Sequence, residues 1–325
     1  MLYVTTRNHQ DAYTVQHVLT GNKCADAGFY VPLHLPKFTT SDLDRMTDMS
    51  FNQRIAEILN LFFGTKLTGW DVDFSAGRYP VRMELIPHRI IMAETWHNPQ
   101  WKYKYLEERL CGLICAQEDV PGNWAEVAVR MAVLAAIILH QMETYEGCID
   151  ISSGCGDFTV PISAWYLREM GFPVGNIICC CNENNHIWEL ICLGQTKVDT
   201  MIPQNLERLI CACCGHEETI RYLRCCKDAE IYAVSDKMLQ ELRKGLFVSV
   251  VSSNRTETAI PNVYKTHHYV LDPDSAQSYS GLMDYRAKTG ISRPAVVLYD
   301  ESPSRNEEII ARCMDLSTEE LRRII

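Results

Sequence analysis

The chain has 325 residues, a formal net charge of −10 and a sequence pI near 5.5. This acidic balance excludes nonspecific nucleic-acid binding, which requires a basic surface. Hydrophobic residues make up 47% of the chain and charged residues 22%, as in globular proteins with two or three compact units. We see no secretory signal and no run long and apolar enough to span a membrane, so we expect a cytoplasmic protein with no membrane partner.

The patterns of the first 88 residues indicate a small α+β unit. They predict the following elements: strands at 2–6 and 29–31, and helices at 14–19, after Ser41 as N-cap, and over 51–63. Gly64 is expected to end the last of these helices, because glycine readily adopts the left-handed conformation found after helices.

A polar and aromatic stretch follows the predicted strand at 89–93 and leads into a predicted helix at 103–115. It contains Lys104 at the entrance of that helix. A lysine held there can form a Schiff base, because burial lowers the pKa of its amine and makes it nucleophilic. A lysine among aromatic residues is also often a surface residue whose stem packs on the rings. The stretch alone leaves both interpretations open.

A strand at 148–152, a glycine-containing loop at 153–157, a helix at 158–170 and a strand at 177–181 predict one turn of a parallel α/β sheet. Such a loop exposes backbone N–H groups at a helix N-terminus, which favours anions. We therefore predict a phosphate cradle made of Gly154, Cys155, Gly156, Asp157 and Phe158. The alternative is that the glycines only form the turn.

The remaining patterns continue the α/β alternation. They predict helices at 124–141, 205–214, 236–245, 256–264, 275–288 and 307–314, and strands at 247–251, 269–273 and 294–299. The helix at 124–141 is apolar around its whole circumference and is expected to be buried.

Fifteen cysteines are unusual for a chain of this size. Those at 179–181 complete an apolar strand, so we interpret most cysteines as reduced, buried, small hydrophobic residues. One denser group is a candidate zinc site: Cys211, Cys213, Cys214, His216, Cys225 and Cys226. We predict no metal site there, because the paired C-x-x-C spacings are missing and 205–214 has a helical pattern.

The segments resemble, in the same order, those of the threonine synthases, pyridoxal-phosphate enzymes of fold type II. The resemblance covers nearly the whole chain. The segments that carry it are Tyr3-Val4-Thr5-Thr6-Arg7, Asp26-Ala27-Gly28-Phe29-Tyr30-Val31-Pro32, the stretch 94–105, Cys155-Gly156-Asp157-Phe158, Asn182-Glu183-Asn184, Asn205-Leu206-Glu207-Arg208-Leu209 and Asp272-Pro273-Asp274-Ser275-Ala276.

This resemblance implies a threonine-synthase-like α/β fold (tryptophan synthase β-like, fold type II) with a parallel-rich twisted sheet flanked by helices. It implies an N-terminal α+β domain at 1–88, a remnant of the small subdomain with the lysine helix at 89–120, and a large α/β domain at 121–325. The chain is a shortened, divergent relative, because only a short polar break separates Gln117 from Asn123. In the family, a loop that grips the substrate carboxylate stands at this point.

The resemblance also implies pyridoxal 5'-phosphate as cofactor and Lys104 as the Schiff-base lysine. It implies that the glycine loop holds the phosphate and that Asp300 faces the ring nitrogen. The expected activity is that of a lyase acting on a small amino acid or its phosphorylated derivative. The alternative is a catalytically degenerate paralogue that binds a ligand or partner without the cofactor. Loss of the small subdomain would expose an apolar face, so we expect a homo-oligomer.

Overall fold

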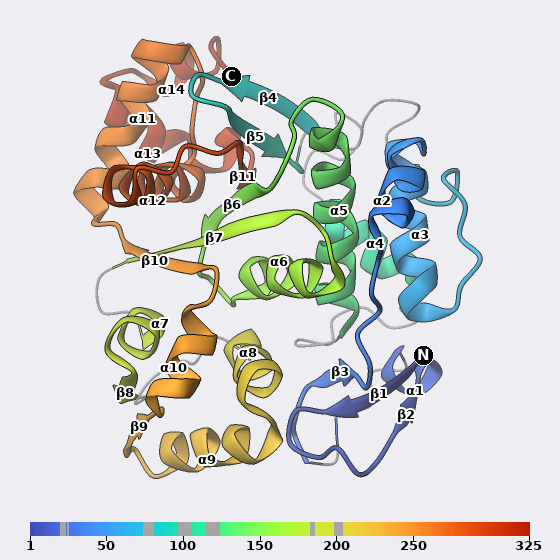
Figure 1. Ribbon diagram of the computed structural model, residues 1–325. Coiled ribbons are helices and arrows are strands. Elements are labelled where there is room, and N and C mark those ends of the chain that lie inside the picture. The colour runs from blue at the N-terminus through green and yellow to red at the C-terminus, as the bar shows by residue number, and fades with distance from the viewer. Residues whose placement is uncertain are drawn as a thin grey trace.

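A six-stranded sheet forms the centre of the computed structural model, in the order β10-β7-β6-β11-β5-β4 (Figure 1). The model describes residues 1–19, 24, 26–73, 81–96, 106–114, 124–182, 186–197 and 204–325. The strands are β4 Arg82–Ile86, β5 Ile90–Glu94, β6 Ile149–Gly154, β7 Val174–Cys181, β10 Leu246–Val250 and β11 Ala295–Tyr299. Neighbouring strands are parallel except β4, which runs antiparallel to β5. The predicted parallel-rich sheet is confirmed.

Helices cover both faces of this sheet (Figure 1). One face carries α5 Trp124–Met142 and α6 Thr159–Met170, and the other carries α11 Ser253–His267, α12 Pro273–Thr289 and α13 Glu307–Met314. Side chains of β7 alternate between the two hydrophobic cores, as strand geometry requires. Ile177 and Cys179 belong to one core, and Ile178 and Cys180 to the other.

The long helix α5 corrects one expectation from the sequence. It has 19 residues and is apolar enough to cross a membrane by length and composition, whereas we expected no such segment. However, 78% of its apolar window is buried inside the protein. Contacts with α3 and α6 account for much of this burial, so α5 is the core helix that its all-round apolar pattern predicts.

The N-terminal unit combines a three-stranded antiparallel sheet with short helices. Its elements are β1 Leu2–Thr5, β2 Tyr13–Thr14, α1 Val15–Leu19, β3 Tyr30–Pro32, α2 Thr40–Thr47 and α3 Phe51–Phe63. Gly64 ends α3 with a φ of 63°, as predicted. The predicted cap of α2 at Ser41 is wrong. Thr39 is the N-cap, because its hydroxyl and the Asp42 carboxylate each accept the backbone N–H of the other residue.

Several short elements complete the chain: α4 Leu106–Ile114, α7 His186–Trp188, a π-helix Glu189–Leu193, β8 Gln195–Lys197, α8 Gln204–Cys214, α9 His216–Lys227, β9 Ile231–Ala233, α10 Asp236–Arg243, a 3₁₀-helix Pro303–Asn306 and α14 Thr318–Leu321. The sequence patterns did not predict β4, α9 or the β8–β9 pair. The predicted strand at 269–273 is wrong, because this segment leads directly into α12.

Asp272 ends that segment as the N-cap of α12. Its Oδ1 accepts a hydrogen bond from the Ser275 N–H at 2.9 Å. The side chain is buried, and its Oδ2 has no hydrogen-bond partner among the residues that the structure describes. Burial raises the pKa of Asp272 to about 7. The folded state therefore keeps a proton that the unfolded chain has already lost, so this group makes the protein less stable as pH rises from about 4 to 7.

Asp272→Asn removes this ionisation and keeps an acceptor for the Ser275 N–H. From pH 4 to pH 8, the free energy of unfolding of the variant should rise relative to that of wild type by roughly 1–3 kcal/mol. One pKa unit corresponds to ~1.4 kcal/mol. Urea unfolding at both pH values measures the change. Asp228→Asn, at an exposed position, is the control. The same pH dependence in Asp272→Asn and wild type would contradict the assignment.

Candidate functional site

The carboxyl ends of the parallel strands meet at one edge of the sheet, which is where ligands bind in open α/β folds. Thr95 follows β5, Asp300 follows β11, and Cys155 follows β6. The strand register brings these positions together, because Tyr299 pairs with Glu94 and β11 also pairs with β6. The fold therefore gathers Asp300 and the glycine loop at this edge. Lys104 lies outside the described residues.

The glycine loop makes a tight turn between β6 and α6. The Cys155 N–H donates to the Cys180 carbonyl at 2.8 Å, and the Phe158 N–H donates to the Cys155 carbonyl at 2.6 Å. Phe158 is buried and has a φ of 69°, in the left-handed region. Gly156 is exposed, and a Cβ built on it would meet no atom of the described residues within 4 Å. Among these residues, the loop thus has open space beside the α6 N-terminus.

Asp157 already fills the hydrogen-bonding role that an anion would take at this helix end. Its Oδ1 accepts the Thr159 N–H at 2.9 Å, and its Oδ2 accepts the Thr159 hydroxyl at 2.6 Å. Pro161, two residues further on, has no N–H to offer. A phosphate placed at this helix end would find the first N–H of α6 already bonded to the Asp157 carboxylate. Within the predicted cradle, the Cys155 and Phe158 N–H groups are already bonded to the Cys180 and Cys155 carbonyls. These three donors are therefore already engaged.

Helix α8 holds the loop in this conformation. The Asn205 side chain donates to the Thr159 hydroxyl at 2.8 Å, and its backbone N–H donates to the Asp157 carbonyl at 3.2 Å. Arg208, one turn along the helix, donates to the Asn205 side-chain oxygen. It also donates to the Tyr30 carbonyl of β3 at 3.3 Å. A continuous set of hydrogen bonds therefore joins the N-terminal unit to the glycine loop.

Glu207 adds an ion pair to this connection. Arg7 donates to both of its carboxylate oxygens, each at 3.0 Å, and the buried Thr6 hydroxyl donates at 2.5 Å. The Arg7 side chain is 25% exposed and the Glu207 side chain 4%. The segment 205–208, which the sequence singled out only by its family resemblance, is thus the contact between two parts of the molecule.

Asp300 is held by two partners that sequence reasoning did not identify. Its Oδ1 accepts the Arg130 Nη1 at 2.9 Å and the Thr95 hydroxyl at 2.8 Å. Arg130 projects from α5 and is the one Lys or Arg in that apolar helix, a signal that marked it in the sequence. The carboxylate is therefore already paired with a guanidinium. A protonated ring nitrogen would have to share it with Arg130.

Glu94, which opens the stretch containing Lys104, is buried beneath the same edge. The Tyr269 hydroxyl donates to it at 2.5 Å, and Arg82 lies 3.9 Å away. Burial raises the pKa of Glu94, and the Tyr269 hydrogen bond and the Arg82 charge oppose that change. Glu94 therefore anchors the end of β5. Its side chain is enclosed by these neighbours, which suits a structural role.

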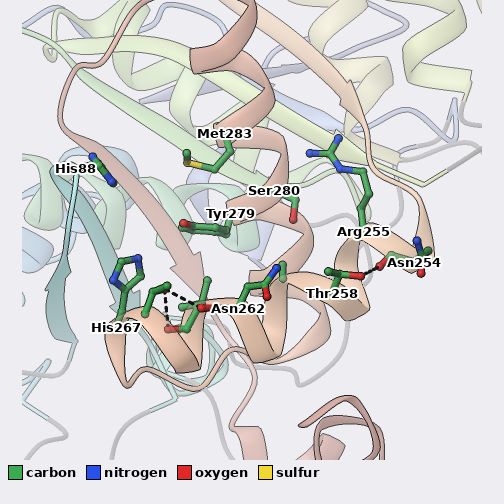
Figure 2. Close-up of a pocket in the computed structure, with 12 residues that line it drawn as sticks. His88, Asn254, Arg255, Thr258, Asn262, His267, Tyr279, Ser280 and Met283 are labelled. Atoms are coloured by element: carbon green, nitrogen blue, oxygen red, sulfur yellow. Dashed lines mark hydrogen bonds between the residues drawn. The ribbon is translucent and has the colours of Figure 1, made fainter.

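An open groove of about 690 Å³ lies between α11 and α12 (Figure 2). Its floor includes the buried Val263 and Ser280. His88 and His267 line one end, and Arg255 lies at the other (Figure 2). The groove shares none of the residues predicted from the sequence. Within the described part of the chain, no group of three His, Cys, Asp or Glu side chains is arranged to hold a metal ion.

Comparisons with known proteins place this geometry in context. The family model "Threonine synthase N terminus" matches residues 2–73. The threonine synthase of Pseudomonas aeruginosa is 24% identical over 203 residues, which are 58% of this chain and 43% of that protein. "Threonine synthase-like 1" of Pongo abelii is 23% identical over 174 residues, which are 47% of this chain and 23% of that protein. The chain thus spans less than half the length of these relatives.

Solved structures establish the fold. The pyridoxal-phosphate-bound threonine synthase of Brucella melitensis superposes with a TM-score of 0.81 at 15% identity, covering 96% of this chain and 91% of that one. The yeast threonine synthase gives 0.83 at 13% identity, covering 99% and 93%. The predicted resemblance to threonine synthases and the predicted fold type II class are confirmed. The roles of Lys104, the loop residues and Asp300 remain predictions.

Glu207→Gln tests the connection between the N-terminal unit and α8. We expect the free energy of unfolding to fall by about 1–3 kcal/mol, less than the ~3–5 kcal/mol of a fully buried pair, because Arg7 is partly exposed. Chemical denaturation measures it. Glu257→Gln removes the exposed ion pair with Arg312 and should change stability by less than about 0.5 kcal/mol. Equal effects of the two changes would argue against the contact.

Proposed function

We propose that this chain is a threonine synthase-like protein that no longer carries out pyridoxal-phosphate chemistry and serves as a binding or interaction protein. The position of the Asp157 carboxylate supports this proposal. It accepts the first N–H of α6 and the Thr159 hydroxyl, within the loop to which the resemblance assigns the cofactor phosphate.

The size of the charge effects decides between acceptance and rejection of a phosphate. Two like unit charges 4 Å apart repel by about 1 kcal/mol in water and by about 4 kcal/mol at an effective dielectric constant of about 20. A helix N-terminus stabilises an anion by about 0.3–1 kcal/mol. Asp157 is exposed, so the lower figure applies, and repulsion from it is comparable to the attraction that the helix offers. The Thr159 N–H, the first of α6, is also already bonded to this carboxylate.

The fold and the order of motifs favour a second function. In this alternative the chain is a pyridoxal-phosphate-dependent lyase acting on a small amino acid or its phosphorylated derivative. Lys104 would carry the cofactor, residues 154–158 would hold its phosphate, and Asp300 would face its ring nitrogen. The cofactor would supply an electron sink for a carbanion. The Arg130–Asp300 pair weakens this alternative, because it engages the predicted partner of that nitrogen.

One titration separates the two functions. Purified protein is mixed with pyridoxal phosphate, and visible absorbance is followed before and after borohydride. We expect no cofactor fixed on Lys104 by peptide mass analysis. Asp157→Asn keeps the shape of the side chain and removes its charge, so we expect about tenfold tighter binding, equivalent to ~1.4 kcal/mol. Asp228→Asn is a matched control with an exposed carboxylate.

A wild-type absorbance band that borohydride fixes on Lys104, and that Lys104→Ala abolishes, would overturn the proposal and support the lyase. Unchanged affinity in Asp157→Asn would remove the electrostatic argument.

We further propose that the chain forms a homo-oligomer through the face left by the missing small subdomain. The proposal follows from the missing subdomain, because large apolar faces are usually interfaces. Light scattering at micromolar concentration should give a mass of at least two chains. A clean monomer under these conditions would contradict it.

A further inference from the structure

Three cysteine side chains gather beneath the glycine loop: Cys155, Cys179 and Cys181. All three are at most 4% exposed, and all belong to the core on the α5 and α6 side of the sheet. Cys180, between the last two, belongs to the opposite core. Strand alternation thus places Cys179 and Cys181 on the face where Cys155 lies. All fourteen cysteines that the structure describes are free thiols.

The strand register sets Cys155 beside Cys181. Gly154 of β6 pairs with Cys180 of β7, and the Cys155 N–H donates to the Cys180 carbonyl at 2.8 Å. The next position along β7 is Cys181. Neighbouring strands lie about 4.8 Å apart, and disulfides join residues with Cα atoms about 4.4–6.8 Å apart. The usual spacing of neighbouring strands therefore falls within the range that a disulfide spans.

The two thiols also interact. Hydrogen bonds to Cys179 and Cys181, together with burial, raise the pKa of the Cys155 thiol. The hydrogen bond from Cys155 lowers the pKa of the Cys181 thiol. These directions favour Cys181 as the attacking thiol, since the thiolate is the reactive form. Cys155 adjoins Gly156, which is exposed.

We propose that Cys155 and Cys181 form a reversible disulfide that ties the glycine loop to β7 under oxidising conditions. With hydrogen peroxide as oxidant, the Cys181 thiolate attacks one oxygen, and a sulfenic acid and hydroxide form as the O–O bond breaks. The Cys155 sulfur then attacks the Cys181 sulfur, and a second hydroxide leaves. The two hydroxides take the two thiol protons and become water. The cysteines lose two electrons, and the peroxide gains them.

The disulfide would tie the loop to β7. Its formation does not depend on whether a cofactor binds at the loop. This modification site therefore does not rest on the proposed function. Failure of pyridoxal phosphate to bind and failure of the disulfide to form are separate results.

The test uses the whole folded chain. Reduced protein is treated with hydrogen peroxide, quenched in acid, and alkylated in denaturant so that every remaining thiol reacts. Peptide mapping without reduction should show one cross-linked species containing Cys155 and Cys181, lighter than the two free peptides by two hydrogens and cleaved by dithiothreitol. Cys148 is exposed and reports that the oxidant reached the protein.

Two variants complete the experiment. Cys155→Ser should abolish the cross-linked species and leave Cys181 open to alkylation. Cys180→Ser lies on the same strand with equal burial but faces the opposite core, so it should leave the cross-link intact. Full alkylation of both Cys155 and Cys181 in oxidised wild type, while Cys148 is oxidised, would overturn the proposal. A cross-link from Cys155 to Cys179 instead would overturn the pairing.

Discussion

The buried guanidinium of Arg208 is the constraint on which the arrangement of the molecule depends. Its side chain is fully buried, and burial lowers its pKa. An unpaired charge in such a place costs several kcal/mol, so its donors must be met by fixed acceptors. The Tyr30 carbonyl and Asn205 meet them, and the rings of Phe29 and Trp124 lie 4.9 Å and 6.0 Å from the guanidinium carbon. These contacts fix the positions of the N-terminal unit, α5 and α8 relative to one another.

The same constraint determines the shape of the glycine loop. Arg208 fixes Asn205, and Asn205 in turn holds the Thr159 hydroxyl and the Asp157 carbonyl. The loop is thus held from outside by α8 as well as by its own glycines. The Thr159 hydroxyl takes part in this connection, so the turn depends on that side chain as well as on the glycines. The segment 205–208, predicted from local patterns only as part of a helix, thus has a structural role.

Local patterns gave the parts of the fold whose causes are local. The unit formed by β6, α6 and β7 follows from one apolar strand, one glycine loop and one helix stop, all within about 30 residues, as in other βαβ units. The β8–β9 pair escaped prediction because its strands have three residues each, and Ile231 is exposed rather than buried. Such strands carry no readable alternation. The partners of Asp300 could not be predicted for a different reason. Arg130 and Thr95 are 170 and 205 residues away from it in the sequence.

At this edge of the sheet, similarity of the backbone to other proteins and the ability to bind an anion depend on different features. The likeness to solved threonine synthases measures the path of the chain, which the α8 contacts and two hydrophobic cores maintain. Anion binding at a helix end depends instead on unoccupied N–H groups and on local charge. Here the Asp157 carboxylate accepts the first N–H of α6. At the other end of the edge, Asp300 is paired with Arg130. Both carboxylates form hydrogen bonds to neighbours within the fold, and both lie at positions where the resemblance predicts cofactor contacts.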